Sequence, residues 1–268
     1  MAQRPKDSPA DPLGIGQGGD PSENPLSGRV AVHPERVSAE AHVAQEIADL
    51  VRSRPGAVLG VATGGTMKGV YRELAVRARD VDLSRIRAFS LDEFLGLSPE
   101  NPHSFRAFLE SHFVGPLGLG AEQLVTPDAS WAEADPAAAA RAYEDHIAEA
   151  GGIDLQLLGI GRNGHVAFNE PGSLAASRTR VIRLDEVTRA DAVGDFGSLD
   201  AVPTRAMTVG IATILDAKQI RLLAFGEGKA AAVGRVLRGP VGGDVPATLL
   251  NAHEGLQLHL DRGAAGLP

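Results

Sequence analysis

The residues most able to do chemistry lie in a glycine-rich segment that holds a histidine and a carboxylate. This segment reads GIGRNGHVAFNEP from Gly159 to Pro171, and Glu170 follows His165 by five residues. A histidine oriented by a carboxylate is a standard acid–base unit, because imidazole titrates near working pH. Asn163 can orient the same imidazole or a substrate hydroxyl. A lone histidine after a strand is more often only packed or exposed, so the prediction of acid–base chemistry rests on the combination.

Metal binding is the rival functional interpretation of this segment, and the spacing of the histidines argues against it. The eight histidines are scattered, and none pair at the spacing of metal ligands. The chain has no cysteine, which excludes disulfides, thiolate zinc sites and cysteine nucleophiles. We therefore expect no metal site.

Two further segments have the features of anion-binding turns. In Thr63-Gly64-Gly65-Thr66, the glycines let the backbone approach a ligand, and the N–H groups of the helix that follows favour an anion. Gly226-Glu227-Gly228-Lys229 repeats this arrangement and adds a lysine, which the helix dipole tolerates poorly unless an anion is present. Each has an ordinary alternative, a tight turn without a ligand or a surface lysine. Two such turns in one sheet favour a phosphate or carboxylate site.

Two adjacent acids, Asp92 and Glu93, form the fourth candidate segment. Like charges repel, so both cannot point into a small cleft at low cost. One can act as a base in the site while the other caps or pairs elsewhere. The alternative, a helix N-cap followed by an acid in the first turn, is common and is favoured when the segment is considered alone.

These segments lie between elements that alternate in type. We expect short apolar strands, several of them continuously apolar, and helices with apolar residues at helical spacing. Ser38 is the expected N-cap of the first helix. The predicted strands are Val30–Val32, Ala57–Val61, Ile86–Leu91, Asp154–Ile160, Ile220–Phe225 and Leu256–Leu260, the last at an edge of the sheet. The predicted helices are Ser38–Val51, Met67–Arg79, Asp135–Ala150 and Lys229–Leu237.

Alternating apolar strands and helices predict an α/β fold in one domain. The expected architecture is a doubly wound, mainly parallel sheet with helices on both faces, in the manner of Rossmann-like folds. In such sheets ligands bind beyond the carboxyl ends of the strands. All four candidate segments follow predicted strands, so the sequence places them where this architecture places active sites.

Length and composition fit a globular protein that binds small molecules. The chain has 268 residues, 43% hydrophobic and 22% charged, and a formal net charge of −8. No basic face for nucleic acid is apparent, and no apolar run reaches the roughly eighteen residues of a membrane span. Residues 1–28 are rich in Pro, Gly, Asp and Ser and are expected to form a disordered extension without signal-peptide character, followed by a domain over 29–268.

The candidate segments, taken together and in order, resemble the glucosamine-6-phosphate deaminase family. The similarity runs from about Val30 to Asp261. Its most specific parts are LGVATGGT (59–66), LDEFLGL (91–97) and the segment that ends in FNEP (168–171), with SRTR (177–180) and MTVGI (207–211) as further matches. Several separated motifs in one order make chance agreement improbable.

This resemblance implies a reaction and a set of roles. The family converts an aminosugar phosphate to fructose 6-phosphate and ammonia without a metal or organic cofactor. By analogy, His165 opens the sugar ring with help from Glu170 and Asn163. Asp92 moves a proton from C2 to C1. Lys229 and the turn formed by Thr63, Gly64, Gly65 and Thr66 hold the phosphate.

The chain departs from the family pattern between Thr188 and Phe196. The family commonly has an asparagine there and then an arginine that helps to bind phosphate, whereas this chain has Asp191 and Gly194. Three alternatives follow: Arg189 or another cation substitutes, the substrate differs, or phosphate affinity is low. The chain also ends soon after Asp261, which predicts no allosteric regulation by an N-acetylated sugar phosphate.

Two other function classes compete with the deaminase. A 6-phosphogluconolactonase-like hydrolase shares the fold and the glycine–histidine segment, but lactone hydrolysis has no C2 deprotonation and no need of Asp92 as a base. A non-catalytic sugar-phosphate-binding protein would not require Asp92, Asn163, His165 and Glu170 together. We expect a cytoplasmic enzyme, monomeric or homo-oligomeric, that acts on a small-molecule aminosugar phosphate and has no nucleic-acid or membrane partner.

Overall fold

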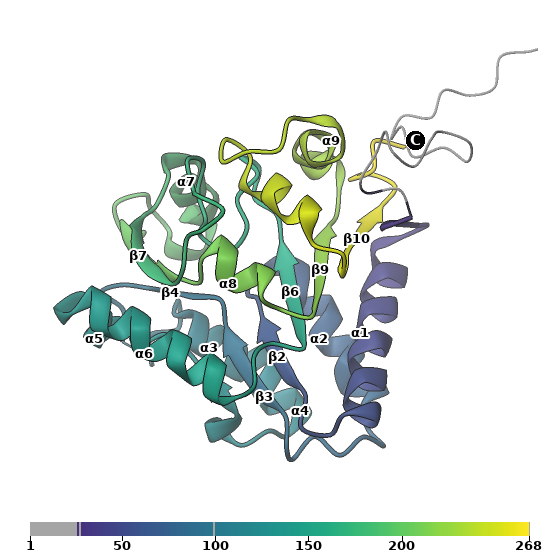
Figure 1. Ribbon diagram of the computed structural model, residues 1–268, viewed down its shortest axis with the longest axis horizontal. Coiled ribbons are helices and arrows are strands. Elements are labelled where there is room, and N and C mark those ends of the chain that lie inside the picture. The colour runs from purple at the N-terminus through teal and green to yellow at the C-terminus, as the bar shows by residue number, and fades with distance from the viewer. Residues whose placement is uncertain (1–25, 27, 99, 268) are drawn as a thin grey trace, which may run out of the picture.

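The computed structural model describes Leu26, residues 28–98 and residues 100–267 (Figure 1). The expected disordered extension over 1–28 lies outside the described residues, except for Leu26 and Gly28. Leu26 is fully buried and packs in the main hydrophobic core. The packed part of the chain therefore includes a residue that the sequence assigned to the extension.

A seven-stranded sheet in which all neighbouring strands are parallel forms the centre of the molecule (Figure 1). Its order is β1-β10-β9-β6-β2-β3-β5. The strands are β1 (Val30–His33), β2 (Val58–Val61), β3 (Arg87–Ser90), β5 (Leu124–Val125), β6 (Leu155–Gly159), β9 (Gln219–Ala224) and β10 (Leu256–Asp261). The central strands are apolar and almost completely buried, as expected for a parallel sheet covered on both faces.

Helices cover both faces of this sheet. Figure 1 shows α6 (Pro136–Glu149) and α8 (Ile211–Leu215) in front of the strands, and α2 (Gly65–Arg77) behind them. Helix α2 packs against α1 (Arg36–Ser53) with a close approach at Gly69, where a Cβ would lie 1.9 Å from the Glu40 carboxyl carbon. The other helices are α3 (Phe105–Leu109), a π-helical turn (Glu110–Val114), α4 (Gly115–Leu117), α5 (Ala129–Ala134), α7 (Glu186–Phe196) and α9 (Ala230–Arg238).

A small antiparallel sheet stands beyond one end of the main sheet. Its order is β4-β8-β7, with β4 (Asp92–Phe94), β7 (Arg180–Arg183) and β8 (Arg205–Thr208). The chain passes from the main sheet into this one at Leu91, whose N–H donates to the Val61 carbonyl. A second, smaller hydrophobic cluster lies under the small sheet and contains Phe94, Phe168, Leu184 and Ala206.

The architecture expected from the sequence is confirmed, with two corrections in detail. The strand Leu256–Leu260 is not at an edge, because β10 pairs with β9 on one side and with β1 on the other. Ser38 is not an N-cap, because α1 begins at Arg36 and its N-cap is Glu35, which makes no side-chain cap. The small sheet and α7 were not predicted.

Within residues 28–98 and 100–267, no helix is long and apolar enough to cross a membrane. The same part of the chain holds no group of three or more histidine, cysteine, aspartate or glutamate side chains that could bind a metal ion.

Candidate active site

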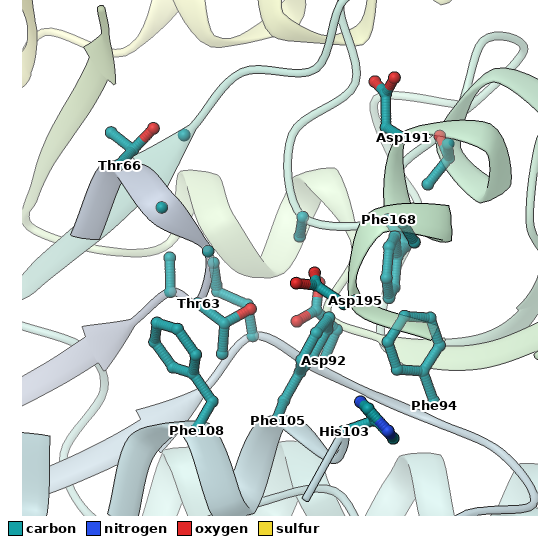
Figure 2. A pocket seen from close by; sticks show the side chains of 18 of the residues that line it. Thr63, Thr66, Asp92, Phe94, His103, Phe105, Phe108, Phe168, Asp191 and Asp195 are labelled. Carbon is teal, nitrogen blue, oxygen red and sulfur yellow. The ribbon is translucent and has the colours of Figure 1, made fainter. Parts of the chain in front are cut away.

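The four candidate segments meet at one edge of the main sheet. They follow β2, β3, β6 and β9, which are contiguous in the order β9-β6-β2-β3. Between β6 and β2 the order of connections reverses, and such a switch point opens a crevice at the carboxyl ends of the strands. A pocket of about 830 Å³ lies there, and it is lined by Thr63–Thr66, Asp92, His165 and Lys229 (Figure 2).

His165 is held by two side chains through one ring nitrogen. Its Nδ1 lies 3.1 Å from the hydroxyl oxygen of Thr188 and 3.5 Å from Oε2 of Glu170. The imidazole is 17% exposed and the Glu170 side chain 12%. No partner of the described chain approaches Nε2, so this nitrogen is the one available to a ligand in the pocket.

Asn163 fixes the carboxylate rather than the imidazole. Its side-chain nitrogen donates to Glu170 Oε2 at 3.0 Å, and its side-chain oxygen accepts from the His165 backbone N–H at 3.2 Å. Burial raises the pKa of Glu170, but interactions with His165, Thr188 and Asn163 outweigh it and leave that pKa below its usual value. The carboxylate is therefore ionised and accepts hydrogen bonds from its neighbours. Asn163 was expected to orient either the imidazole or a substrate hydroxyl. Its side chain acts on the imidazole only indirectly, by holding Glu170.

The glycines of this segment let the imidazole lie directly on the backbone. A Cβ at Gly161 would lie 2.3 Å from Cε1 and Nδ1 of His165. Gly164 has φ of +90°, and Ala167 has φ of +50°, which is unusual for a residue with a side chain. The turn after β6 is therefore shaped around the position of the ring.

Asp92 lies at the crossing between the two sheets. It is the first residue of β4, pairs with Thr208 of β8, and is 5% exposed. No side-chain or backbone donor of the described residues reaches its carboxylate. Burial, and then the charge of Glu93, raise the pKa of Asp92 well above its usual value. Such a carboxylate becomes a stronger base once it is ionised.

The neighbouring acid has the capping role that the sequence allowed. The Glu93 carboxylate accepts backbone N–H groups from Phe94, Phe105 and Arg106, each at 2.9 Å, and so caps the N-terminus of α3. The two acids lie in a strand and not at the start of a helix, so the alternative of an N-cap followed by a first-turn acid is wrong. Asp92 points into the pocket (Figure 2).

Both anion-binding turns reach the pocket. Gly64 is the N-cap of α2 with φ of +93°, and no side chain caps this helix, so its first N–H groups are available to an anion. Gly226 has φ of +82°, and its N–H donates to both carboxylate oxygens of Asp261 at 2.9 Å. Lys229 Nζ has no partner in the described chain. Burial lowers the pKa of Lys229, Asp191 raises it, and Arg162 lowers it further.

Helix α7 forms the wall opposite these turns and carries the residues that depart from the family pattern. Arg162 makes a two-nitrogen ion pair with Asp191, with Nε 3.1 Å from Oδ2. Arg189 does not enter the pocket, because it donates to the carbonyls of Leu199 and Val202 at 2.7 and 3.1 Å. The expectation that Arg189 could replace the missing arginine is therefore wrong. Gly194 lines the pocket.

An aromatic cluster closes the pocket beside Asp92. Phe94 contacts Phe105, Phe168 and Phe196 with ring centroids 4.7 to 5.4 Å apart. His103 packs on Phe196 at 4.9 Å. Figure 2 shows Phe94 and Phe168 on one side of Asp92 and Phe108 on the other. The cluster gives this side of the pocket an apolar wall.

The structure brings all nine predicted site residues to this pocket or its immediate support. Thr63, Gly64, Gly65, Thr66, Asp92, His165 and Lys229 line it, and Asn163 and Glu170 hold the imidazole from behind. Sequence reasoning missed Thr188, the aromatic cluster and Asp195 of α7. A threonine or an aspartate in a polar helix carries no signal of its own. The pattern of four phenylalanines becomes meaningful only when the small sheet is known.

Several known proteins are similar to this chain. Residues 36–259 match the family model described as glucosamine-6-phosphate isomerases/6-phosphogluconolactonase. A protein named glucosamine-6-phosphate deaminase from Rhodopirellula baltica is 45% identical over 240 residues, which cover 89% of this chain and 95% of that protein. Another of that name, from Bacillus velezensis, is 42% identical over 236 residues, which cover 87% and 96%.

Solved structures resemble the fold at two levels of sequence identity. One described as a monomeric glucosamine-6-phosphate deaminase superposes with a TM-score of 0.84 at 39% identity, covering 90% of this chain and all of that one. The 6-phosphogluconolactonase from Trypanosoma brucei superposes with a TM-score of 0.72 at 21% identity, covering 88% and 97%. The second likeness shows a common fold alone.

Proposed function

This chain belongs to the family of glucosamine-6-phosphate isomerases and 6-phosphogluconolactonases, and we propose that within it the chain is a glucosamine-6-phosphate deaminase. The reaction takes glucosamine 6-phosphate and water to fructose 6-phosphate and ammonia. One observation carries the proposal at the level of chemistry. A histidine held by a carboxylate, a buried aspartate without partners and an unpaired lysine line the same pocket.

His165 opens the sugar ring. Because Glu170 is ionised and lies at Nδ1, that nitrogen carries the proton and Nε2 is free to accept one. Nε2 takes the proton from the anomeric hydroxyl and delivers it to the ring oxygen as the C1–O5 bond breaks. Asn163 holds the Glu170 carboxylate, and Thr188 holds the His165 ring, in the positions that this transfer requires.

Asp92 moves the proton that converts the aldose to a ketose. A C2 proton beside a carbonyl is only weakly acidic, so position and desolvation of the base matter more than its solution pKa. Asp92 takes the C2 proton of the open chain and delivers it to C1. In the same conversion a proton passes from the amino nitrogen to O1, so C1 becomes a hydroxymethyl group and C2 an imine. Water adds to C2 and ammonia leaves.

Lys229 and the turn Thr63–Thr66 hold the phosphate. The uncapped N-terminus of α2 and the unpaired Nζ are the two features that support this assignment. Binding energy from the phosphate, which does not react, holds the sugar in its reacting geometry. Because sugar phosphates are intracellular metabolites, we propose a cytoplasmic enzyme. We further propose that it acts as a monomer, like the 39% identical relative described as monomeric.

The lactonase alternative is supported by fold likeness alone, at 21% identity. Lactone hydrolysis needs no base at C2, and a binding protein without activity needs no buried, unpaired carboxylate. Asp92 is costly to keep in this place, and that cost is expected only where the carboxylate reacts.

Incubation with glucosamine 6-phosphate, with ammonia and fructose 6-phosphate measured together, tests the proposal. We expect equal amounts of both products. Absence of both from folded protein would contradict the proposal. Galactosamine 6-phosphate and 6-phosphogluconolactone, measured in parallel, identify a different epimer or the lactonase.

A further inference from the structure

Helix α7 presents two carboxylates to the pocket, four residues apart. Asp191 and Asp195 both line it, and residues at this spacing lie on the same face of a helix. An enzyme for an anionic substrate gains nothing from two negative charges on one wall unless each has a cation to meet. The question is which cation each of them meets.

Asp191 already has its cation. Arg162, in the turn after β6, donates hydrogen bonds to both of its carboxylate oxygens through Nε and one terminal nitrogen. In Figure 2 the Asp191 carboxylate points toward the rim of the pocket and away from Asp92. This ion pair joins α7 to the turn that carries His165, and it leaves Asp191 neutralised.

Asp195 has no such partner. Among the described residues, no side chain or backbone group forms a hydrogen bond or ion pair with its carboxylate. Figure 2 shows this side chain directed into the middle of the pocket, where Asp92 also points. The free carboxylate therefore faces the region where the substrate reacts and not the phosphate turns.

We propose that Asp195 binds the protonated amino group of the substrate and thereby selects aminosugar phosphates. The inference rests on the proposed function, since it assigns a partner within the same pocket. Glucosamine 6-phosphate carries an anion at C6 and a cation at C2. The pocket offers a complementary pair, Lys229 for the anion and Asp195 for the cation.

The same arrangement rejects sugars without the amine. A ligand with a hydroxyl at C2 leaves the Asp195 charge uncompensated in a partly closed pocket that also holds a phosphate. An unpaired charge costs more than a lost neutral contact, so the discrimination comes from repulsion as well as attraction. Helix α7 lacks the family's phosphate-binding arginine. In this proposal the helix instead binds the amino group of the substrate.

Two open-chain alditols that cannot react test the proposal by calorimetry. They are 2-amino-2-deoxyglucitol 6-phosphate and glucitol 6-phosphate, which differ only at C2. We expect the wild-type protein to bind the amino ligand about tenfold more tightly, from one charge-assisted contact at a partly exposed carboxylate. In Asp195→Asn, the amino ligand is expected to lose that advantage, while glucitol 6-phosphate binds as well as before or better.

Asp191→Asn is the matched control, because it removes a carboxylate of the same helix and the same pocket wall. Its effect is expected to be equal for the two ligands, since both carry the phosphate. Asp195→Glu is expected to restore part of the preference. Thermal denaturation of each variant shows that the fold is retained.

The outcomes separate this inference from the function itself. Preference for the amine in wild type that persists in Asp195→Asn overturns the role of Asp195 and leaves the deaminase proposal standing. Failure of wild type to bind either ligand contradicts the proposed function. A preference that weakens as pH rises and the amine loses its proton, in wild type but not in Asp195→Asn, supports the ionic contact.

Discussion

At the scale of the residue, the burial of Asp92 links stability to activity. The carboxylate must be ionised to accept the C2 proton, and its pKa lies well above the usual value. Activity is therefore lost as pH falls through this raised pKa. The acid limb of the profile of kcat against pH is expected at higher pH than for an aspartate with the usual pKa. Initial rates between pH 4 and pH 9 measure it. An acid limb near the ordinary aspartate pKa would contradict the assignment.

Asp92→Asn is expected to abolish turnover and exchange of the C2 proton in deuterated water, while binding of the inert alditol phosphates is retained. The same variant is expected to unfold at a higher temperature than wild type at neutral pH. A carboxylate whose folded pKa is raised loses stability as pH rises from its unfolded pKa to its folded one, and asparagine removes this cost. Normal proton exchange in the variant would refute the role of Asp92.

Lys229→Ala tests the phosphate end of the pocket. Since the lysine contacts a group that does not react, we expect KM to rise far more than kcat falls. Inorganic phosphate is expected to inhibit the wild type and to lose this effect on the variant. An unchanged KM would place the phosphate elsewhere in the pocket.

Most residues of the candidate site were predictable from the sequence, and the exceptions have a common cause. His165, Glu170, Asp92 and Lys229 follow strands in glycine-rich or acidic segments, so local pattern identified them. Thr188 and the residues of α7 belong to a helix without strong apolar periodicity, and only the folded chain turns them toward the pocket.

At the scale of the element, the turn after β6 is built so that His165 lies against Gly161. In Gly161→Ala the new Cβ would lie 2.3 Å from the imidazole. A side chain yields more readily than backbone, so we expect the ring to move and the melting temperature to change little. Misplacement of a catalytic group by about 1 Å can cost roughly a hundredfold in rate, and a loss of kcat of that order is expected.

Gly56→Ala is the control for this variant. Gly56 precedes β2 and is not among the residues that line the pocket, and nothing lies within 4 Å of a Cβ there. Its kcat is expected to stay close to that of wild type. A loss of kcat in Gly56→Ala as large as in Gly161→Ala would show that the effect does not come from the packing of the ring.

The main sheet was predictable from sequence and the small sheet was not. Mostly apolar runs such as Leu155–Gly159 are bounded by turns, so their strands are evident. Asp92–Phe94 and Arg205–Thr208 are short and mixed in polarity, and they become strands only because they pair with each other. The position of β10 inside the sheet was also missed, since order along the chain does not reveal order across a sheet.

At the scale of the whole molecule, a cluster of three histidines joins the two ends of the chain. His33 of β1, His42 of α1 and His259 of β10 have ring centroids 5.4 Å apart. Glu46 of α1 lies 3.8 Å from both His42 and His259, and Arg221 of β9 pairs with Glu46 at 2.9 Å. Burial, and then Arg221, His33 and His42, lower the pKa of His259 to about 3.

This cluster predicts a loss of stability in mild acid. A histidine with a lowered pKa in the folded state binds its proton more tightly when unfolded, so its contribution is intact above pH 6.5 and is lost as pH falls toward 3. At pH 5 the loss from His259 is about 2 kcal/mol. Urea unfolding at pH 7 and pH 5 measures it. His259→Phe is expected to flatten the dependence, whereas substitution of the exposed His146 is expected to leave it unchanged.

The pairing of β1 with β10 also sets the order in which the protein can be completed during synthesis. Among the strands that the structure describes, β1 pairs only with β10, which is also the last of them along the chain. While the ribosome is still making the C-terminal region, the central strands β2, β3 and β6 can already pair. Until β10 is present, β1 has no partner strand and one edge of β9 is unpaired. Long-range pairing of this kind is slow and leaves strand edges exposed to other chains. The nascent protein is therefore most prone to aggregation just before its final strand emerges.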